Sequence, residues 1–318
     1  MENKSLSPNR RRVALLFTDG VGIGENDRSV NPLARDQYLL SQFKSGGDST
    51  LPSGGQRFEL DTCFGLPGRP QSATNQTAIL TGRPAPQEIG RHQLGFPNAV
   101  LRNILAGSSI VRRIKEAGGN SAFANAYPAG YLDALGLAHR PSPTPDVEIP
   151  LKYQRKVRAS ASTLAMAAGG VELRTLEDAR NGEGLTHDIE GIRARTRGFE
   201  VPLRSTEDAA KLFWRIAQTH DFTFFEHYLA DEAGHAQDWE ASKLALSVFD
   251  RFSRQVIDQR PADAVVMICS DHGNVEDLST RGHTRNDVPF LYFGDSPCDF
   301  PVRTVADVGL AVLHEILG

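Results

Sequence analysis

Aspartates and histidines gather in four short motifs, and each motif lies beside an apolar segment that reads as a buried strand. Taken singly, an aspartate at a strand end is more often a helix cap or a turn residue. Taken together, carboxylate oxygens and imidazole nitrogens suit Zn or Mn, whereas sites built from oxygen alone suit Mg or Ca. The sequence therefore predicts a ligand set for two divalent metal ions, Mn or Zn, formed by Asp19, Asp231, His235, Asp271, His272 and His283.

The stretch SATNQTAILTG, residues 72–82, holds one serine and three threonines that could supply a nucleophilic oxygen. We expect a helix over residues 73–80 with Ser72 at its N-cap, where a serine ordinarily accepts a backbone hydrogen bond. A helix N-terminus also favours negative charge and phosphate oxygens, and a hydroxyl bound there to a dication ionises more readily than a free serine. Ser72 is therefore the candidate nucleophile, whereas capping or packing is expected of Thr74, Thr77 and Thr81.

The segment DGVGIG, residues 19–24, has the glycine content of a dinucleotide-binding turn but not its spacing. The third glycine of that pattern would fall at residue 25, which is Glu25. We expect instead that these glycines let the backbone approach the metal site around Asp19 closely.

The motifs must be positioned by predicted strands and helices, which alternate along the chain. An α/β fold with a mainly parallel sheet sandwiched by helices follows from this alternation, and ligands bind such sheets beyond the carboxyl ends of the strands. Within the polar, Gly-rich residues 28–60, the stretches SGGDST and PSGGQ read as surface loops. Strands are predicted over 12–18, 121–127, 221–230, 263–270 and 288–294, and helices over 108–119, 207–218 and 240–258.

Residues 131–204 differ from their surroundings, with a Pro-rich stretch, a basic stretch and the loop-like ARNGEGLTHDIEG. We predict that they form a small inserted lid, or cap subdomain. Residues 1–130 and 205–318 would then form the metal-binding catalytic core.

Composition limits the partners and the compartment. The formal net charge of -4 comes without a long run of one sign, which argues against binding to nucleic acid or to a membrane surface. No signal peptide or membrane span is expected from the sequence. The three cysteines, Cys63, Cys269 and Cys298, are widely spaced, so a cytoplasmic location is expected.

These motifs resemble the alkaline phosphatase superfamily of two-metal phosphoryl-transfer enzymes, and most closely its cofactor-independent phosphoglycerate mutases and phosphopentomutases. Members carry a nucleophilic Ser or Thr followed ten positions later by Gly, a spacing that Ser72 and Gly82 reproduce. The segments DGVGIG, DEAGH, SDHGN and GHT are similar to the metal motifs of that branch. The resemblance covers roughly residues 12–130 and 205–318, and it implies an alkaline phosphatase-like core.

Carried over to this sequence, the resemblance implies two metal sites and a phosphoserine on Ser72. One ion would be held by Asp231, His235 and His283. The other would be held by Asp19, Asp271, His272 and the Ser72 oxygen. The substrate would be a small phosphorylated molecule, and candidates to bind its phosphate are Asn75, Arg91 and Gln93.

Three functions remain open from the sequence. Hydrolysis of a small phosphate ester is favoured, because the predicted lid is much smaller than the inserted domain of the phosphoglycerate mutases. In addition, Gln76 stands where those mutases and the phosphopentomutases have a histidine. A phosphomutase of the phosphoglycerate or phosphopentose type is the alternative, and a non-catalytic metal-binding protein is the third. A sulfatase is disfavoured, because the Pro and Arg that follow a sulfatase nucleophile are missing after Ser72.

Overall fold

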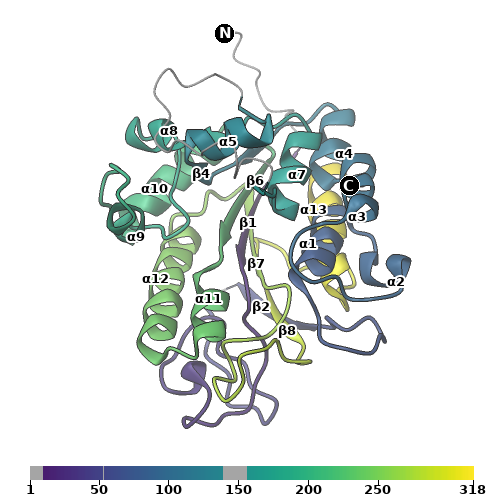
Figure 1. Cartoon of the computed structure of the whole chain (residues 1–318), viewed down its shortest axis with the longest axis vertical. Coiled ribbons are helices and arrows are strands. Elements are labelled where there is room, and N and C mark those ends of the chain that lie inside the picture. The colour runs from purple at the N-terminus through teal and green to yellow at the C-terminus, as the bar shows by residue number, and fades with distance from the viewer. Residues whose placement is uncertain (1–9, 53, 139–155) are drawn as a thin grey trace.

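A six-stranded sheet forms the centre of the molecule (Figure 1). The computed structural model describes residues 10–52, 54–138 and 156–318. The strands lie in the order β2-β8-β7-β1-β6-β3. They are β1 (Arg12–Thr18), β2 (Gly55–Leu60), β3 (Ser121–Phe123), β6 (Phe222–His227), β7 (Ala264–Cys269) and β8 (Val288–Phe293).

The prediction of a mainly parallel sheet is confirmed. β7, β1, β6 and β3 run parallel, whereas β8 and β2 are antiparallel to their neighbours. β2 was not predicted, and the loop predicted for PSGGQ is wrong at Gly55 and Gln56, which begin β2 and pair with β8. Its sequence GQRFEL is polar because all but its last residue are at least partly exposed, as expected of an edge strand.

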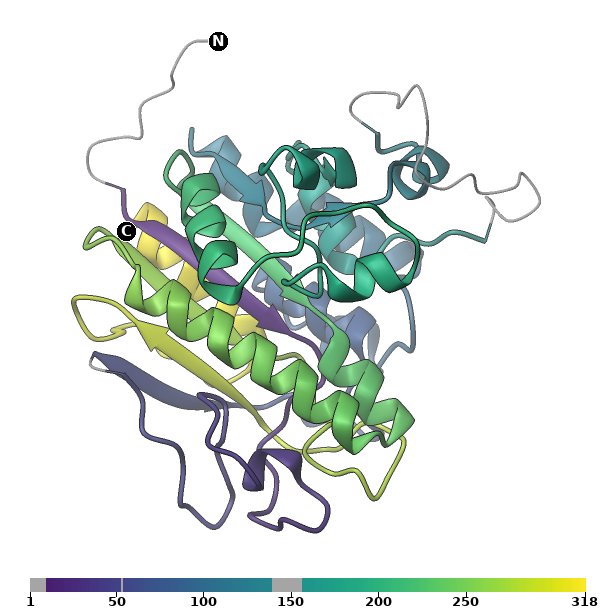
Figure 2. The same ribbon diagram turned by 90° about the vertical axis from the view of Figure 1, so that its left-hand side faces the viewer.

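Helices cover both faces of the sheet, because side chains that alternate along each strand enter two separate cores. In β1, Val13, Leu15 and Phe17 enter the core on one face, and Ala14 and Leu16 enter the core on the other. The first face is covered by α1 (Ser72–Thr81), α3 (Ala99–Ser108), α4 (Ile110–Glu116), α7 (Ala161–Ala168) and α13 (Val305–Leu317). The second is covered by α10 (Thr206–Ala217) and α12 (Trp239–Asp258). Figure 2 shows the long α12 running across the sheet.

Among the described residues, no helix is long and apolar enough to cross a membrane.

Part of the predicted lid belongs to the main core. The apolar side of α7 packs in the same cluster as α1 and α4. β5 (Arg174–Thr175) in this segment pairs with β4 (Ala126–Tyr127), which precedes the predicted lid, in a separate two-stranded sheet. Near them lie α5 (Ala129–Leu135), α8 (Leu176–Arg180) and α9 (Ile192–Thr196). Residues 139–155 of the predicted lid lie outside the described residues, and the boundaries at 131 and 204 stay a prediction.

One predicted boundary shifts in a way that matters for the site. The strand expected over 221–230 ends at His227, and α11 (Leu229–Ala236) begins two residues later. The motif DEAGH is therefore helical. Since residues four apart lie on the same face of a helix, Asp231 and His235 point the same way.

Candidate metal centre

All six predicted metal ligands lie together beyond the carboxyl ends of three neighbouring parallel strands. Asp19 directly follows β1, and Asp271 and His272 follow β7. The helix that follows β6, α11, carries Asp231 and His235. The chain returns through His283 before it enters β8. The fold thus brings together residues that are up to 264 positions apart in the sequence (283 minus 19).

Asp231, His235 and His283 form one group of potential ligands. The Nε2 atom of His235 lies 3.3 Å from Oδ2 of Asp231, and Nε2 of His283 lies 3.6 Å from Oδ1. The two histidine Nε2 atoms are 3.1 Å apart. Asn274 donates a 2.6 Å hydrogen bond to Asp231 Oδ1 and so fixes the carboxylate.

The second nitrogen of each of these histidines is bound to the backbone. Nδ1 of His235 lies 2.6 Å from the carbonyl of Arg281, and Nδ1 of His283 lies 2.7 Å from the carbonyl of Pro70. A carbonyl only accepts, so each Nδ1 carries a proton, and in the neutral ring Nε2 is the nitrogen whose lone pair can bind a cation beside Asp231. Two lone pairs and a carboxylate that converge on one point fit a cation, and a backbone hydrogen bond on the far nitrogen is the usual support of a metal-bound histidine.

Asp19, Asp271, His272 and Ser72 form the second group. Nε2 of His272 lies 2.8 Å from the Ser72 hydroxyl, 3.3 Å from Asp19 Oδ1 and 3.5 Å from Asp271 Oδ2. Asp271 and His272 have no exposed surface, and Asp19 is 8% exposed. Oδ1 of Asp19 is buried without a hydrogen-bond partner. A buried carboxylate oxygen that lacks a donor is costly, and a cation bound here would satisfy it.

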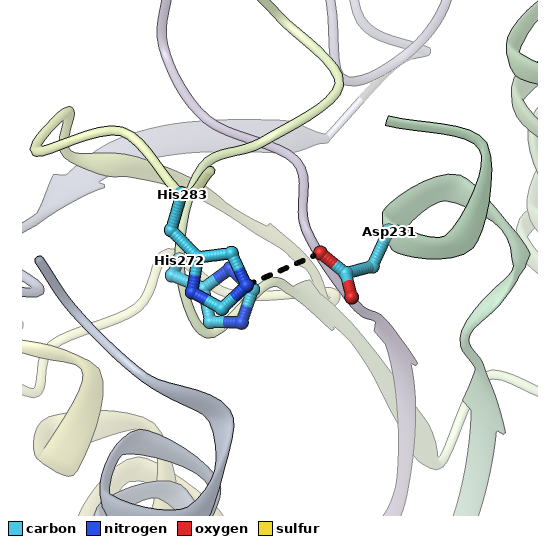
Figure 3. Close-up of side chains that lie close together, drawn as sticks. All are labelled: Asp231, His272 and His283. Carbon is cyan, nitrogen blue, oxygen red and sulfur yellow. Dashed lines mark ion pairs between the residues drawn. The ribbon is translucent and has the colours of Figure 1, made fainter. Parts of the chain in front are cut away.

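The two groups are contiguous at His272. Its ring stacks on that of His283 with the centroids 3.6 Å apart, and Figure 3 shows Asp231 facing both rings. Ligand atoms of Asp231, His272 and His283 lie within 4.8 Å of one another, as do those of Asp19, Asp271 and His272. One dense cluster thus offers two overlapping sets of ligands.

The charges of the cluster are unbalanced without cations. Burial raises the pKa of Asp19 well above its usual range, and the neighbouring charges of Asp271 and Asp231 raise it further. Burial, opposed in part by His272, also raises the pKa of Asp271. At Asp231 burial is outweighed by the hydrogen bond with His235 and the charge of His272, so the pKa falls. The hydrogen bond with Asp231 in turn raises the pKa of His235 to about 9.

Ser72 is the first residue of α1, one position later in the helix than predicted. The N-cap is Gln71, which makes no side-chain capping bond. The predicted helix 73–80 is therefore two residues longer, and the Ser72 hydroxyl meets His272 at 2.8 Å. At the other end, Thr77 and Thr81 each donate to a backbone carbonyl four residues earlier, as the sequence predicts.

Two glycines have a physical role in this geometry. Gly20 has a φ of +77°, and a Cβ there would lie 2.6 Å from Cβ of Asp231. The glycine next to Asp19 therefore makes room for a ligand on α11. Gly82 ends α1 with a φ of +69° and packs against Leu310 of α13, so the spacing from Ser72 to Gly82 spans the helix from its first residue to its cap.

The three residues predicted to bind phosphate lie in different places. Asn75 is fully buried, and its amide donates to the carbonyls of Thr62 and Asp271, so it supports Asp271 from inside the protein. Arg91 is exposed and donates to Gln93, which in turn accepts from Asn98. Neither Arg91 nor Gln93 lines the pocket above Ser72. Their role in phosphate binding stays a prediction.

Two neighbours of the site, Gln76 and Glu226, make contacts that the sequence did not predict. Gln76 donates through one nitrogen to Asp19 Oδ2 and to Asp271 Oδ2, each at 3.0 Å. Glu226 is a buried acid in the middle of an apolar strand and accepts a 2.7 Å hydrogen bond from Ser162. Burial raises the pKa of Glu226 to about 7. An acid within an otherwise apolar run was the one available signal for Glu226.

Comparisons with known proteins find similarity to metalloenzymes. Residues 186–315 match the family model described as the Metalloenzyme superfamily. The phosphopentomutase of Helicobacter acinonychis is 31% identical over 96 residues, which are 29% of this chain and 23% of that protein. The 2,3-bisphosphoglycerate-independent phosphoglycerate mutase of Natronomonas pharaonis is 32% identical over 111 residues, 31% of this chain and 22% of that protein. The chain thus spans less than a quarter of the length of these two relatives.

Similar solved structures support the fold. The alkaline phosphatase from the Antarctic bacterium TAB5 has a TM-score of 0.55 at 14% identity and covers 96% of this chain and 98% of its own. The PH0037 protein from Pyrococcus horikoshii has a TM-score of 0.52 at 15% identity, with 96% of each chain covered. The predicted resemblance to alkaline phosphatase superfamily metalloenzymes, and the predicted fold, are confirmed.

Proposed function

We propose that this protein is a two-metal phosphoryl-transfer enzyme that hydrolyses a small phosphate ester through a phosphoserine on Ser72. The observation that carries the proposal is the position of the Ser72 hydroxyl. It lies at the first residue of α1 and 2.8 Å from Nε2 of His272, in a cluster with Asp19 and Asp271. A nucleophile, a positive helix end and cation ligands are thus combined in one place.

The residues on hand fit two divalent cations, for which we propose Mn or Zn. Asp231, His235 and His283 would hold one ion, and Asp19, Asp271, His272 and Ser72 the other. When bound, the ions would lower the pKa of the serine hydroxyl and offset the negative charge of the phosphoryl group. A mutant alkaline phosphatase from TAB5 is described with bound Mg, which supports a divalent cation in such a fold.

The proposed reaction has two steps, formation of a phosphoserine on Ser72 and its hydrolysis by water. The Ser72 hydroxyl releases its proton to water and its oxygen attacks phosphorus. The bond from phosphorus to the alcohol oxygen breaks, and the leaving alkoxide takes a proton from water. The N-terminus of α1 favours the negative charge that remains on the phosphoserine. Water then attacks phosphorus, inorganic phosphate leaves and the Ser72 hydroxyl is restored.

A phosphomutase is the second candidate, because the two relatives given above are named as mutases. In that case the phosphoserine returns its phosphoryl group to a different oxygen of the substrate. We favour hydrolysis, because Gln76 occupies the place of the mutases' histidine and is held by Asp19 and Asp271.

Phosphate release separates the two reactions. The Mn- or Zn-loaded protein should release inorganic phosphate from p-nitrophenyl phosphate, and Ser72→Ala should lower kcat at least about 10³-fold. Ser108→Ala, which changes an exposed hydroxyl that accepts a hydrogen bond from Arg83, is the matched control and should keep wild-type turnover.

Two results would change the proposal. Isomerisation of a pentose or glycerate phosphate without phosphate release would identify a mutase. Full metal-dependent turnover by Ser72→Ala would remove Ser72 as the nucleophile.

A further inference from the structure

The pocket that contains Ser72 has an aromatic wall in addition to its metal side, and the proposed reaction assigns no role to this wall. The pocket has a volume of about 740 Å³, and Ser72, Asp19 and Asp231 lie on its metal side. Facing the same space are five aromatic rings that come from four separate segments: Phe96, Tyr127, Tyr131, His187 and Tyr228.

Four of these rings form a continuous row. Tyr127 and Tyr131 stack with their centroids 5.4 Å apart and their planes 17° apart. The ring of His187 meets Tyr127 edge-on at 4.9 Å, and Tyr228 lies 5.2 Å beyond His187. Tyr131 comes from α5 and His187 from the loop before α9, so two of the four rings lie in the predicted lid and two, Tyr127 and Tyr228, lie outside it.

The row carries no charge at neutral pH. Burial raises the pKa of the Tyr127, Tyr131 and Tyr228 hydroxyls, so they remain protonated. Burial lowers the pKa of His187 to about 4, so its ring is neutral. The Tyr127 and Tyr131 hydroxyls already bond to Thr163 and to the Arg158 carbonyl. Arg158 and Arg197 also line the pocket, so an anionic group can bind elsewhere in it. The uncharged row of rings itself fits a flat apolar group, which packs on aromatic side chains.

Since the attacked phosphorus must lie beside Ser72, the alcohol part of the ester extends into the rest of the pocket. We propose that this alcohol carries a flat aromatic ring that packs on the wall formed by Tyr127, Tyr131, His187 and Tyr228. The proposal rests on the proposed function and narrows its substrate to phosphate monoesters of aromatic alcohols.

Benzyl phosphate and cyclohexylmethyl phosphate provide the test. Both are esters of primary alcohols with similar size and acidity, so they differ mainly in the flatness of the ring. We expect kcat/KM to be about tenfold higher for benzyl phosphate. In Tyr131→Leu and Tyr228→Leu this preference should fall to about twofold or less, because kcat/KM decreases more for benzyl phosphate than for cyclohexylmethyl phosphate.

Phe300→Leu is the matched control, since Phe300 is a partly buried aromatic residue beside His314 and away from this pocket. It should keep the full preference for benzyl phosphate. Equal kcat/KM for the two esters in the wild type, or equal losses for both esters in the tyrosine variants, would overturn the proposal.

A binding measurement separates this inference from the proposed function. Benzylphosphonate and cyclohexylmethylphosphonate cannot be hydrolysed, and calorimetry reports their affinities for the metal-loaded protein. About tenfold tighter binding of benzylphosphonate supports the aromatic wall even where no ester is turned over, a result that would contradict only the hydrolysis. Turnover of both esters at the same rate, with equal binding of the phosphonates, would contradict only the aromatic wall.

Discussion

Gln76 lies between two carboxylates that would otherwise repel each other. Its amide nitrogen donates to both Asp19 and Asp271 at 3.0 Å, and all three residues are buried. The amide therefore keeps two candidate ligands of the same ion at a fixed separation. Groups that orient metal ligands in this way commonly contribute 10- to 100-fold to metal affinity.

We expect Gln76→Ala to weaken binding of one of the two cations by about 10- to 100-fold. Titration with Co²⁺, followed by absorption spectroscopy, reports this affinity without any assay of turnover. Gln87→Ala, which removes an exposed amide that donates to the Phe64 carbonyl, should leave both affinities unchanged. Unaltered Co²⁺ binding by Gln76→Ala would show that the amide does not position the ligands.

The burial of His227 should make the protein less stable in acid. It is fully buried at the end of β6 and stacks on Phe249. Burial, helped by the charges of His187 and Arg193, lowers its pKa from 6.5 to about 3. Below pH 6.5 the His227 side chain is therefore protonated in the unfolded chain but stays neutral in the folded protein. The free energy of unfolding consequently falls as the pH drops from 6.5 toward 3.

In His227→Gln this dependence should be weaker by about 1.4 kcal/mol per pH unit. Urea unfolding of the metal-free protein between pH 4 and pH 6 measures the slope. Between pH 7 and pH 8 the variant and the wild type should show the same slope, which serves as the internal control. Identical slopes below pH 6 would mean that His227 does not remain neutral when buried.

At the scale of elements, α1 is fixed at both of its ends. Ser72 starts the helix beside His272, and Gly82 ends it in the left-handed conformation against α13. Gly90 ends α2 (Ala85–Ile89) with the same φ of +69°, but a Cβ there would meet nothing within 4 Å. Comparing the stability costs of alanine substitutions at Gly82 and Gly90 therefore distinguishes backbone strain from a steric clash with a neighbouring side chain.

Gly90→Ala should cost about 1 kcal/mol of stability, because only the left-handed backbone is strained. Gly82→Ala should cost at least about 1 kcal/mol more, because its Cβ would lie 2.6 Å from Cδ2 of Leu310. Chemical denaturation of both variants measures the difference. Equal costs would show that the contact between α1 and α13 does not depend on Gly82.

The predicted and observed elements differ where a local sequence pattern is compatible with two kinds of secondary structure. The apolar run before DEAGH predicts a strand up to residue 230, but Asp231 and His235 lie on one face only because α11 begins at Leu229. The edge strand β2 escaped prediction because its polar sequence is typical of a surface loop. In contrast, Asp19, Asp271 and His272 follow strands with clear apolar patterns, and the site was predictable there.

At the scale of the whole molecule, the site depends on contacts between distant segments. The order of motifs along the chain was enough to predict that six ligands meet, because parallel strands end at the same edge of a sheet. That Ser72 joins them was implied by the family resemblance. The contacts of Gln76, the burial of Asn75 and the aromatic wall were not predictable, because each depends on how side chains from separate elements pack. The comparisons support the same fold, with alkaline phosphatase from TAB5 covering 96% of this chain.

The central claim is that one cluster of ligands holds two cations. Equilibrium dialysis of the full chain against Mn²⁺, followed by elemental analysis, tests it most directly. We expect two ions per chain in the wild type and about one in each of Asp231→Asn and Asp271→Asn, since each change removes a carboxylate from a different group. A wild-type protein that retains no ion, or only one, at saturating Mn²⁺ and again at saturating Zn²⁺ would contradict the two-metal account.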